Sequence, residues 1–128
     1  MSTIMNTVDR IGDVALVNSI IDKSITEFTD NICTSIGEYA FFQCTNLTRV
    51  DISSATIIRN NSFSGCSKLE TLILRNANIV SLASANALSN TLIENGTGYI
   101  YVPSNLVDDY KTDSEWSAYE NQIKAIEE

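Results

Sequence analysis

Apolar and polar positions follow the same order twice along the middle of the chain. The segment IGEYAFFQCTNLTRVDI at 36–52 matches IRNNSFSGCSKLETLIL at 58–74 when the two are offset by 22 residues. The coinciding apolar pairs are Ile36 and Ile58, Phe41 and Phe63, Cys44 and Cys66, Leu47 and Leu69, Val50 and Leu72, and Ile52 and Leu74. A fixed period without gaps indicates repeated structural units that stack on one another.

Each unit ends in a stretch that we expect to form a β-strand. In 50–52 and 72–74 the first and third residues fall on one face, because strand side chains alternate. The preceding EYAFFQC and NNSFSGC are too short for an ordinary helix and suit one helical or 3₁₀ turn that points Phe41 or Phe63 inward. One unit cannot bury its own apolar edge, so successive units must stack around a shared core. The L-x-x-V-x-I ending at this period is typical of a leucine-rich repeat.

A third and degenerate unit follows at 79–103. It keeps an Asn-Ala-Leu core at 86–88 and inserts residues before a strand predicted at 99–102. Gly96 and Gly98 indicate a turn before that strand, and Pro103 ends its pairing. Terminal units of a solenoid are expected to be atypical because they close its open end.

Helical spacing replaces the repeat after Pro103. A short helix is predicted there, with an apolar side made by Leu106, Val107 and Tyr110. Ser114 is a candidate cap for a second helix, in which Trp116, Tyr119 and Ile123 follow at i, i+3 and i+7. We interpret Trp116 and Tyr119 as a lid over the last strand rather than as a sugar platform, because aromatic residues at helical spacing usually belong to a core.

The N-terminal segment has apolar residues at helical spacing and lies outside the repeat. It precedes a first strand predicted at 24–28. Two roles are open for it, a cap on the first unit or an assembly helix that docks on a larger particle or on copies of the chain. We predict assembly, because a narrow apolar stripe buries more area against a partner than against one strand. The stripe consists of Ile4, Val8, Ile11 and Ala15.

Composition narrows the possible chemistry. The 128 residues, 44% of them hydrophobic, suit one domain, and the net charge of −8 disfavours nucleic acid and anionic membranes as partners. The chain has no histidine, which excludes HExxH zinc sites and histidine-dependent catalytic triads. Cys44 and Cys66 recur at the repeat period, so we expect buried fillers rather than metal ligands. No calcium loop, phosphate loop or selected carboxylate pair is found, and we predict a non-enzymatic chain without cofactor or metal.

The chain contains no apolar run near the ~20 residues that cross a membrane, so we expect no membrane insertion. Its start also lacks a basic leader followed by an unbroken apolar stretch, and we expect no export by the usual route.

The repeated phrases resemble the BspA-like leucine-rich repeats of bacterial surface proteins and phage-encoded proteins. The family motif reads approximately I-G-x-x-A-F-x-x-C-x-x-L-x-x-V-x-I-P, and both IGEYAFFQCTNLTRVDI and FSGCSKLETLILRN are similar to it. The second copy departs from the motif with Arg59 at the glycine position and Ser62 at the alanine position. The proline expected after each strand is replaced by Ser53 and Arg75.

The resemblance and the spacing together predict an α/β fold. We expect a short right-handed leucine-rich-repeat solenoid with a parallel sheet and about three repeats of 22 residues. The expected divisions are an N-terminal helical cap or assembly segment at 1–22, leucine-rich repeats at 23–103 and a C-terminal helical cap at 104–128.

The outward side of the predicted strands is the candidate binding surface. If the strands pair in parallel, the residues between the buried ones form one patch with a mixture of side chains seen at interfaces. The alternative is the ordinary solvated side of a sheet, and both readings stay open. The predicted partner-binding residues, with Ile73 exposed among them, are Arg49, Asp51, Ile73, Arg75, Tyr99 and Tyr101.

The resemblance implies a non-catalytic interaction module that mediates attachment or assembly. It offers two settings: a phage virion component such as a head decoration, fibre or tail-tip protein, or a bacterial cell-surface adhesin module. We favour the virion, since no export signal is visible in the sequence. The expected partner is a protein or a bacterial surface, with the chain as a homo-oligomer or as part of a larger assembly.

Overall fold

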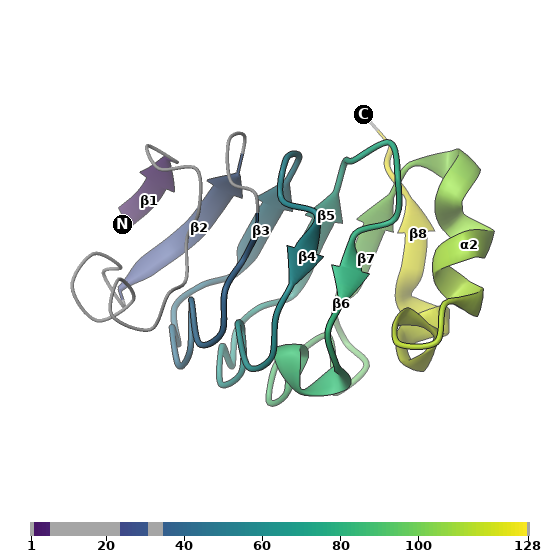
Figure 1. The fold of residues 1–128 in the computed structure, drawn as a ribbon. Helices are drawn as coiled ribbons and strands as arrows, with labels where there is room; N and C mark the ends of the chain where they lie inside the picture. The colour runs from purple at the N-terminus through teal and green to yellow at the C-terminus, as the bar shows by residue number, and fades with distance from the viewer. Residues whose placement is uncertain (1, 6–23, 31–34, 128) are drawn as a thin grey trace.

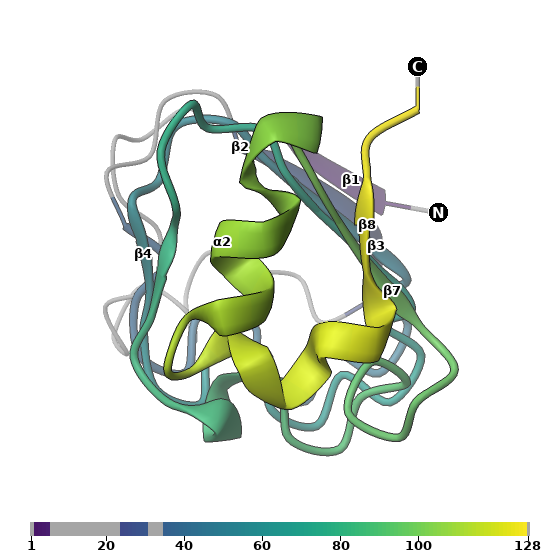
Figure 2. The ribbon, with the colours of Figure 1, turned by 90° about the vertical axis from the view of Figure 1, so that its right-hand side faces the viewer.

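The computed structural model describes residues 2–5, 24–30 and 35–127, the first of these ranges by its backbone alone. Within these residues a parallel sheet of six strands runs along the molecule in the order β1-β2-β3-β5-β7-β8 (Figure 1). The strands are β1 Ser2–Met5, β2 Ile25–Asp30, β3 Arg49–Ile52, β5 Thr71–Leu74, β7 Tyr99–Val102 and β8 Ile123–Ala125. Two short strands, β4 Ile57–Ile58 and β6 Ser81–Leu82, pair in parallel on the opposite side (Figure 2). The chain therefore winds in successive coils, each adding a strand to the sheet.

Strand register follows the sequence period. Arg49 pairs with Thr71, which lies 22 residues further along, and the pairing continues in step to Ile52 and Leu74. Thr71 pairs with Tyr99, 28 residues on, because the third coil contains an inserted turn that reaches Gly98. The predicted strands at 50–52, 72–74 and 99–102 are confirmed, and the strand predicted at 24–28 is found at Ile25–Asp30.

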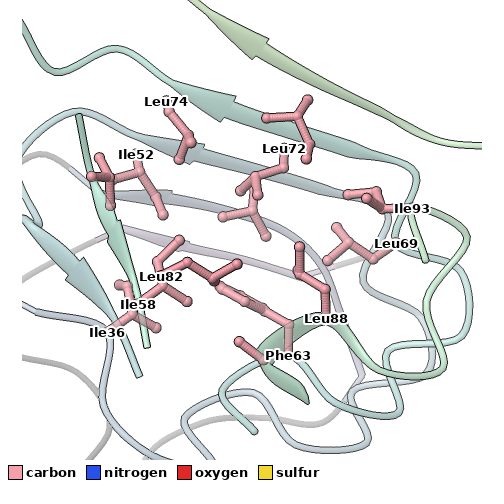
Figure 3. Packing of buried hydrophobic residues seen from close by; sticks show 14 of the residues in the cluster. Ile36, Ile52, Ile58, Phe63, Leu69, Leu72, Leu74, Leu82, Leu88 and Ile93 are labelled. Atoms are coloured by element: carbon pink, nitrogen blue, oxygen red, sulfur yellow. The ribbon is translucent and has the colours of Figure 1, made fainter. Parts of the chain in front are cut away.

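The core fills the space inside the coils (Figure 3). Every member of the six repeated apolar pairs is fully buried. The Phe41 and Phe63 rings stack with centroids 5.2 Å apart at an interplanar angle of 6°, and Phe28 continues the ladder at 4.6 Å from Phe41. The Cys66 thiol donates a hydrogen bond of 2.9 Å to the Phe41 carbonyl, so the cysteine position supplies a small buried group with a satisfied donor. Cys44 and Cys66 are both buried and unlinked, as predicted.

In each coil, the segment that leads into the strand of the six-stranded sheet is a series of tight turns. In the first repeated copy, hydrogen bonds from the Ala40 N–H to the Gly37 carbonyl and from the Cys44 N–H to the Phe41 carbonyl each close a four-residue turn. Left-handed residues interrupt them, at Gln43 (φ 58°) and at the matching Gly65 (φ 81°) of the next copy. The predicted helical turn is thus present, but these residues prevent it from growing into a helix. The third coil alone of the described coils has a regular 3₁₀ helix here, Ala85–Leu88.

The C-terminal lid covers the open end of the core. The helix α2 Val107–Thr112 and the 3₁₀ segment Trp116–Gln122 lie across the interior of the last coil (Figure 2). Trp116 is fully buried and its indole N–H donates to the Val80 carbonyl at 2.7 Å, while the Val80 N–H donates to the Tyr110 hydroxyl at 2.8 Å. The two lid side chains therefore satisfy the backbone N–H and carbonyl of Val80, which would otherwise be buried without a hydrogen-bond partner. Trp116 and Tyr119, the two residues predicted to form a lid, are both buried.

Two details of the lid differ from the prediction. The carboxylate of Asp113, not the hydroxyl of Ser114, accepts the N–H groups of Glu115 and Trp116, at 3.0 and 3.1 Å. Ile123 does not continue the helix, because the chain extends at that residue and pairs with Ile100 as part of β8. The 104–128 segment therefore contributes a strand to the sheet as well as a cap.

The predicted N-terminal helix is wrong at residues 2–5, which form β1 and pair in parallel with β2. Ile4 belongs to this strand, but its side chain is not described. Val8, Ile11 and Ala15 lie outside the described residues, as does Cys33.

Candidate binding surface on the front of the sheet

The front face, meaning the face of the six-stranded sheet that points away from the core, carries two rows of side chains. Each row consists of residues that pair with one another across neighbouring strands. The residues that separate the two rows along each strand, such as Val50 and Leu72, point inward. The first row is Glu27, Arg49, Thr71 and Tyr99. The second row is Thr29, Asp51, Ile73, Tyr101 and Lys124. Five of the six predicted binding residues thus share two adjacent rows, and Arg75 lies two positions beyond Ile73.

Four charged residues form an ionic ladder over β2, β3 and β5: Glu27, Arg49, Asp51 and Arg75. The Arg75 guanidinium binds both oxygens of Asp51, through Nε at 2.7 Å and Nη2 at 3.0 Å. The Arg49 guanidinium lies 3.4 Å from the Asp51 carboxylate and 4.0 Å from the Glu27 carboxylate. The Asp51 side chain is only 11% exposed, so the two-pronged contact with Arg75 is partly shielded from water. The charges of the ladder therefore face one another across the strands.

An aromatic corner made by Tyr99, Tyr101 and Lys124 occupies the other end of the front face, over β7 and β8. The two tyrosine rings lie 6.3 Å apart at an angle of 47°. The Lys124 ammonium sits 5.1 Å from the centroid of the Tyr99 ring, within range of a cation–π contact. Tyr99 is 40% exposed, the largest exposure of any large hydrophobic side chain that the structure describes.

A hollow of about 290 Å³ opens beside the aromatic corner. Among the residues described, its walls are Ile73, Tyr101, Ile126 and Glu127. The Ile126 N–H donates to the Val102 carbonyl at 2.9 Å, which extends the pairing past β8 and fixes the chain that forms the outer wall. The hollow is therefore built between the second row of the sheet and the residues that follow its last strand.

Two predicted surface residues are more buried than expected. Ile73 points outward as predicted, but only 6% of it is exposed, because it lies between Asp51 and Tyr101 and faces the hollow rather than open solvent. Asp51 is 8% exposed, since Arg75 lies against both of its oxygens. The prediction of an exposed Ile73 is therefore wrong, although its position on the candidate surface is correct.

Lys124, Ile126 and Glu127 were not among the predicted site residues, because they lie in the segment predicted to be a helical cap. A signal was available: Lys124 follows Tyr101 by nearly one repeat period and pairs with it in the sheet.

The lid contains tyrosines whose ionisation differs from that of free tyrosine. Burial raises the pKa of Tyr119 to about 12, with further contributions from the nearby carboxylates of Glu94 and Glu115. Burial also raises the pKa of Tyr110, partly offset by its hydrogen bond with Val80. Both groups therefore remain neutral well above neutral pH and act as hydrogen-bonding parts of the lid.

Within residues 2–5, 24–30 and 35–127, no cluster of three or more His, Cys, Asp or Glu side chains is arranged to hold a metal ion. In the same part of the chain, no helix is long and apolar enough to cross a membrane.

Comparison with protein families identifies the repeat. Residues 2–107 match the model of the BspA type leucine rich repeat region, with six copies. The chain belongs to the BspA-type leucine-rich repeat family. Leucine-rich repeat domains of this kind are generally non-catalytic interaction modules. The family match has more copies than the three or so repeats predicted, and it begins at residue 2, in the segment that was predicted to lie outside the repeats. A comparison with curated proteins finds no match for the chain.

Proposed function

We propose that this leucine-rich repeat chain is a non-catalytic module that binds a protein partner through its front face. The observation that carries the proposal is the aromatic corner beside the hollow, where Tyr99 is exposed on a sheet whose other face is buried. Tyrosine side chains offer a large contact area and lose little conformational freedom on binding, and they are enriched among the residues that dominate interface energies.

The aromatic corner is a better contact region than the ionic ladder. A partner that covered the ladder would remove water from charges already paired with one another, and desolvation would offset much of any new attraction. At the aromatic corner, the ring of Tyr99 and the walls of the hollow have partly exposed apolar surface to bury. We therefore assign the main contact to Tyr99, Tyr101 and the hollow, and a structural role to Arg49, Asp51 and Arg75.

The proposal of a non-catalytic role is supported by the family, because leucine-rich repeat domains of this kind are generally non-catalytic interaction modules.

We further propose that the chain is a virion component, as a head decoration, fibre or tail-tip protein that serves attachment or assembly. The resemblance to phage-encoded members of the family supports this setting, and a bacterial cell-surface adhesin module is the alternative. The test is an antibody against the chain, applied to purified phage particles and to intact cells of the producing strain. The proposal expects the chain in the particle fraction. Labelling of intact cells instead would favour the adhesin, and the chain in neither fraction would contradict both.

The contact surface is tested by rebinding of purified chain to particles, or cells, from which its gene has been deleted. Tyr99→Ser combined with Tyr101→Ser should weaken rebinding by at least about tenfold. The control is Glu27→Gln combined with Arg49→Gln, which alters two residues of the same face without changing net charge and should have less than about a threefold effect. The opposite ranking would place the contact on the ionic ladder and overturn the proposal.

Self-assembly through the N-terminal stripe stays a prediction. Val8→Ser combined with Ile11→Ser should lower the mass measured by light scattering while the circular dichroism spectrum stays folded. An unchanged mass would contradict the assembly role.

A further inference from the structure

We infer that the hollow accepts a basic side chain, lysine or arginine, of the protein partner. This inference rests on the proposed function, because it takes the front face as the interface and specifies the chemistry of the partner there.

The walls of the hollow suit the stem of a long basic side chain. Ile73 and Ile126 supply aliphatic surface, and Tyr101 supplies an aromatic ring. Lysine and arginine side chains pack their methylene stems against such surfaces and keep their charged ends near polar groups. The volume of about 290 Å³ lies just below the range of roughly 300–1,000 Å³ for small-molecule pockets, so the hollow has room for one side chain rather than a large cofactor.

Charge determines which kind of side chain fits best. Glu127 is an exposed carboxylate on the wall and forms no ion pair with any residue that the structure describes. Two cations of the front face have other partners: Arg75 binds the carboxylate of Asp51, and Lys124 lies over the ring of Tyr99. The carboxylate of Glu127 therefore lines the hollow without an ion-pair partner among the described residues.

A cationic side chain satisfies both features of the hollow together. Its charged end can pair with Glu127, and the ring of Tyr101 adds a favourable contact for a cation. The net charge of −8 favours the approach of basic segments over acidic ones. An acidic side chain would meet repulsion from Glu127, and an apolar one would shield that carboxylate from water without pairing it.

The test uses the full chain, labelled with ¹⁵N, and three capped peptides as probes: Gly-Lys-Gly, Gly-norleucine-Gly and Gly-Glu-Gly. Norleucine has a linear aliphatic stem similar to that of lysine but no charge, so the pair separates apolar packing from charge. The lysine peptide should shift the amide resonances of Ile73, Tyr101, Ile126 and Glu127 in a saturable titration at low salt. The norleucine peptide should bind about threefold more weakly or worse, and the glutamate peptide should produce no shift at these residues.

A pair of variants locates the charge that is responsible. Glu127→Gln should weaken binding of the lysine peptide by about threefold, as expected for one exposed ion pair. Glu120→Gln is the matched control, because Glu120 is an exposed acid of the lid outside the hollow. It removes the same charge and should leave the affinity nearly unchanged.

Several results would overturn the inference: no saturable shift with the lysine peptide, equal affinity for the norleucine peptide, or equal effects of the two glutamate variants. The last result would mean that the peptide responds to net charge alone. Failure here is separable from failure of the proposed function. If the lysine peptide does not bind but Tyr99→Ser with Tyr101→Ser still abolishes rebinding to particles, the front face remains the interface and only the basic-side-chain specificity is wrong.

Discussion

The ionic ladder and the aromatic corner occupy the same two rows of one sheet, yet they differ in what their side chains still have available. In the ladder, each charged side chain faces an opposite charge on its own or a neighbouring strand. At the aromatic corner, Tyr99 is exposed and Glu127 lines a hollow without an ion pair among the described residues. The repeat thus builds both regions on one backbone, and the outward side chains determine whether the charges are already paired, as in the ladder, or whether surface stays exposed, as at the aromatic corner.

The largest expected effects come from the core on which both regions rest. Phe41→Ala should lower the free energy of unfolding by about 3–5 kcal/mol, because it removes the middle ring of a fully buried ladder. Trp116→Ala at the lid should cost a similar amount, since it also removes the hydrogen bond to Val80. Urea unfolding followed by circular dichroism measures both, with the exposed Tyr39→Ala as a control of small effect.

The same experiment tests whether the two regions unfold together. In the unsubstituted chain, Trp116 fluorescence reports the lid, and circular dichroism reports the whole sheet. We expect coincident transitions, because one continuous core joins them. Separate transitions would divide the molecule into two independent units and contradict the shared-core account.

A smaller effect should separate the two regions by role. Asp51→Asn should lower stability by about 1–2 kcal/mol, because it leaves Arg75 with a neutral partner in place of a carboxylate. Its effect on rebinding to particles should stay below about twofold. Glu27→Gln, whose ion pair at 4.0 Å is more exposed, should change stability by less than about 0.5 kcal/mol. If Asp51→Asn left stability intact and abolished rebinding, the ladder and not the aromatic corner would be the contact region.

The fold was predictable wherever the apolar period is regular. The pairs from Ile36 to Leu74 fix strand positions and inward faces, because a repeat that stacks must place the same residue in the same layer. Prediction failed at Ile4, which lies in β1, because a spacing of four residues between apolar positions fits one face of a helix and also the even positions of a strand. It failed again at Ile123, where spacing of i, i+3 and i+7 continued beyond the true end of the 3₁₀ segment at Gln122.

The candidate surface was predictable in position but not in exposure. Alternation alone placed Ile73, Asp51 and Tyr101 on the outward face. Exposure depends on which long side chains cover a residue and on where the chain runs after the last strand. The alternation of side chains along β5 predicts neither. The outer wall of the hollow is formed by Ile126 and Glu127, outside the segment assigned to the repeats.

A stabilising substitution tests how strictly the coils obey the family pattern. Ser62 is fully buried, and its hydroxyl has no hydrogen-bond partner among the described residues. The equivalent position one coil earlier is Ala40, also fully buried, so Ser62→Ala should fit and raise stability by about 1 kcal/mol. The paired control is Ser53→Ala, which should lower stability by about 1 kcal/mol because the Ser53 hydroxyl donates to the Asp30 carbonyl at 2.6 Å. If both substitutions changed the free energy of unfolding in the same direction, the equivalence of Ser62 and Ala40 would be refuted.

The smallest effect concerns the lid in alkaline solution. The folded-state pKa of Tyr119, about 12, lies above the ordinary value of 10.0, so the folded chain holds its proton more tightly than the unfolded chain. The resulting stability is fully present below about pH 10 and is lost as pH rises toward 12. Tyr119→Phe should cost about 0.5–1 kcal/mol at neutral pH through the lost bond to Ala85, and its stability should fall less between neutral pH and about pH 11. Urea midpoints at both pH values provide the comparison.

The central claim is that the partner covers the aromatic corner, and side-chain footprinting tests it most directly. Tyr99 and Tyr39 have nearly equal exposures, 40% and 37%, but Tyr39 belongs to a turn and not to the front face. Hydroxyl-radical oxidation of the two tyrosines should therefore proceed at similar rates in the free chain. On binding to particles, the account predicts strong protection of Tyr99 and unchanged oxidation of Tyr39. Protection of Tyr39 with Tyr99 still reactive would contradict the account.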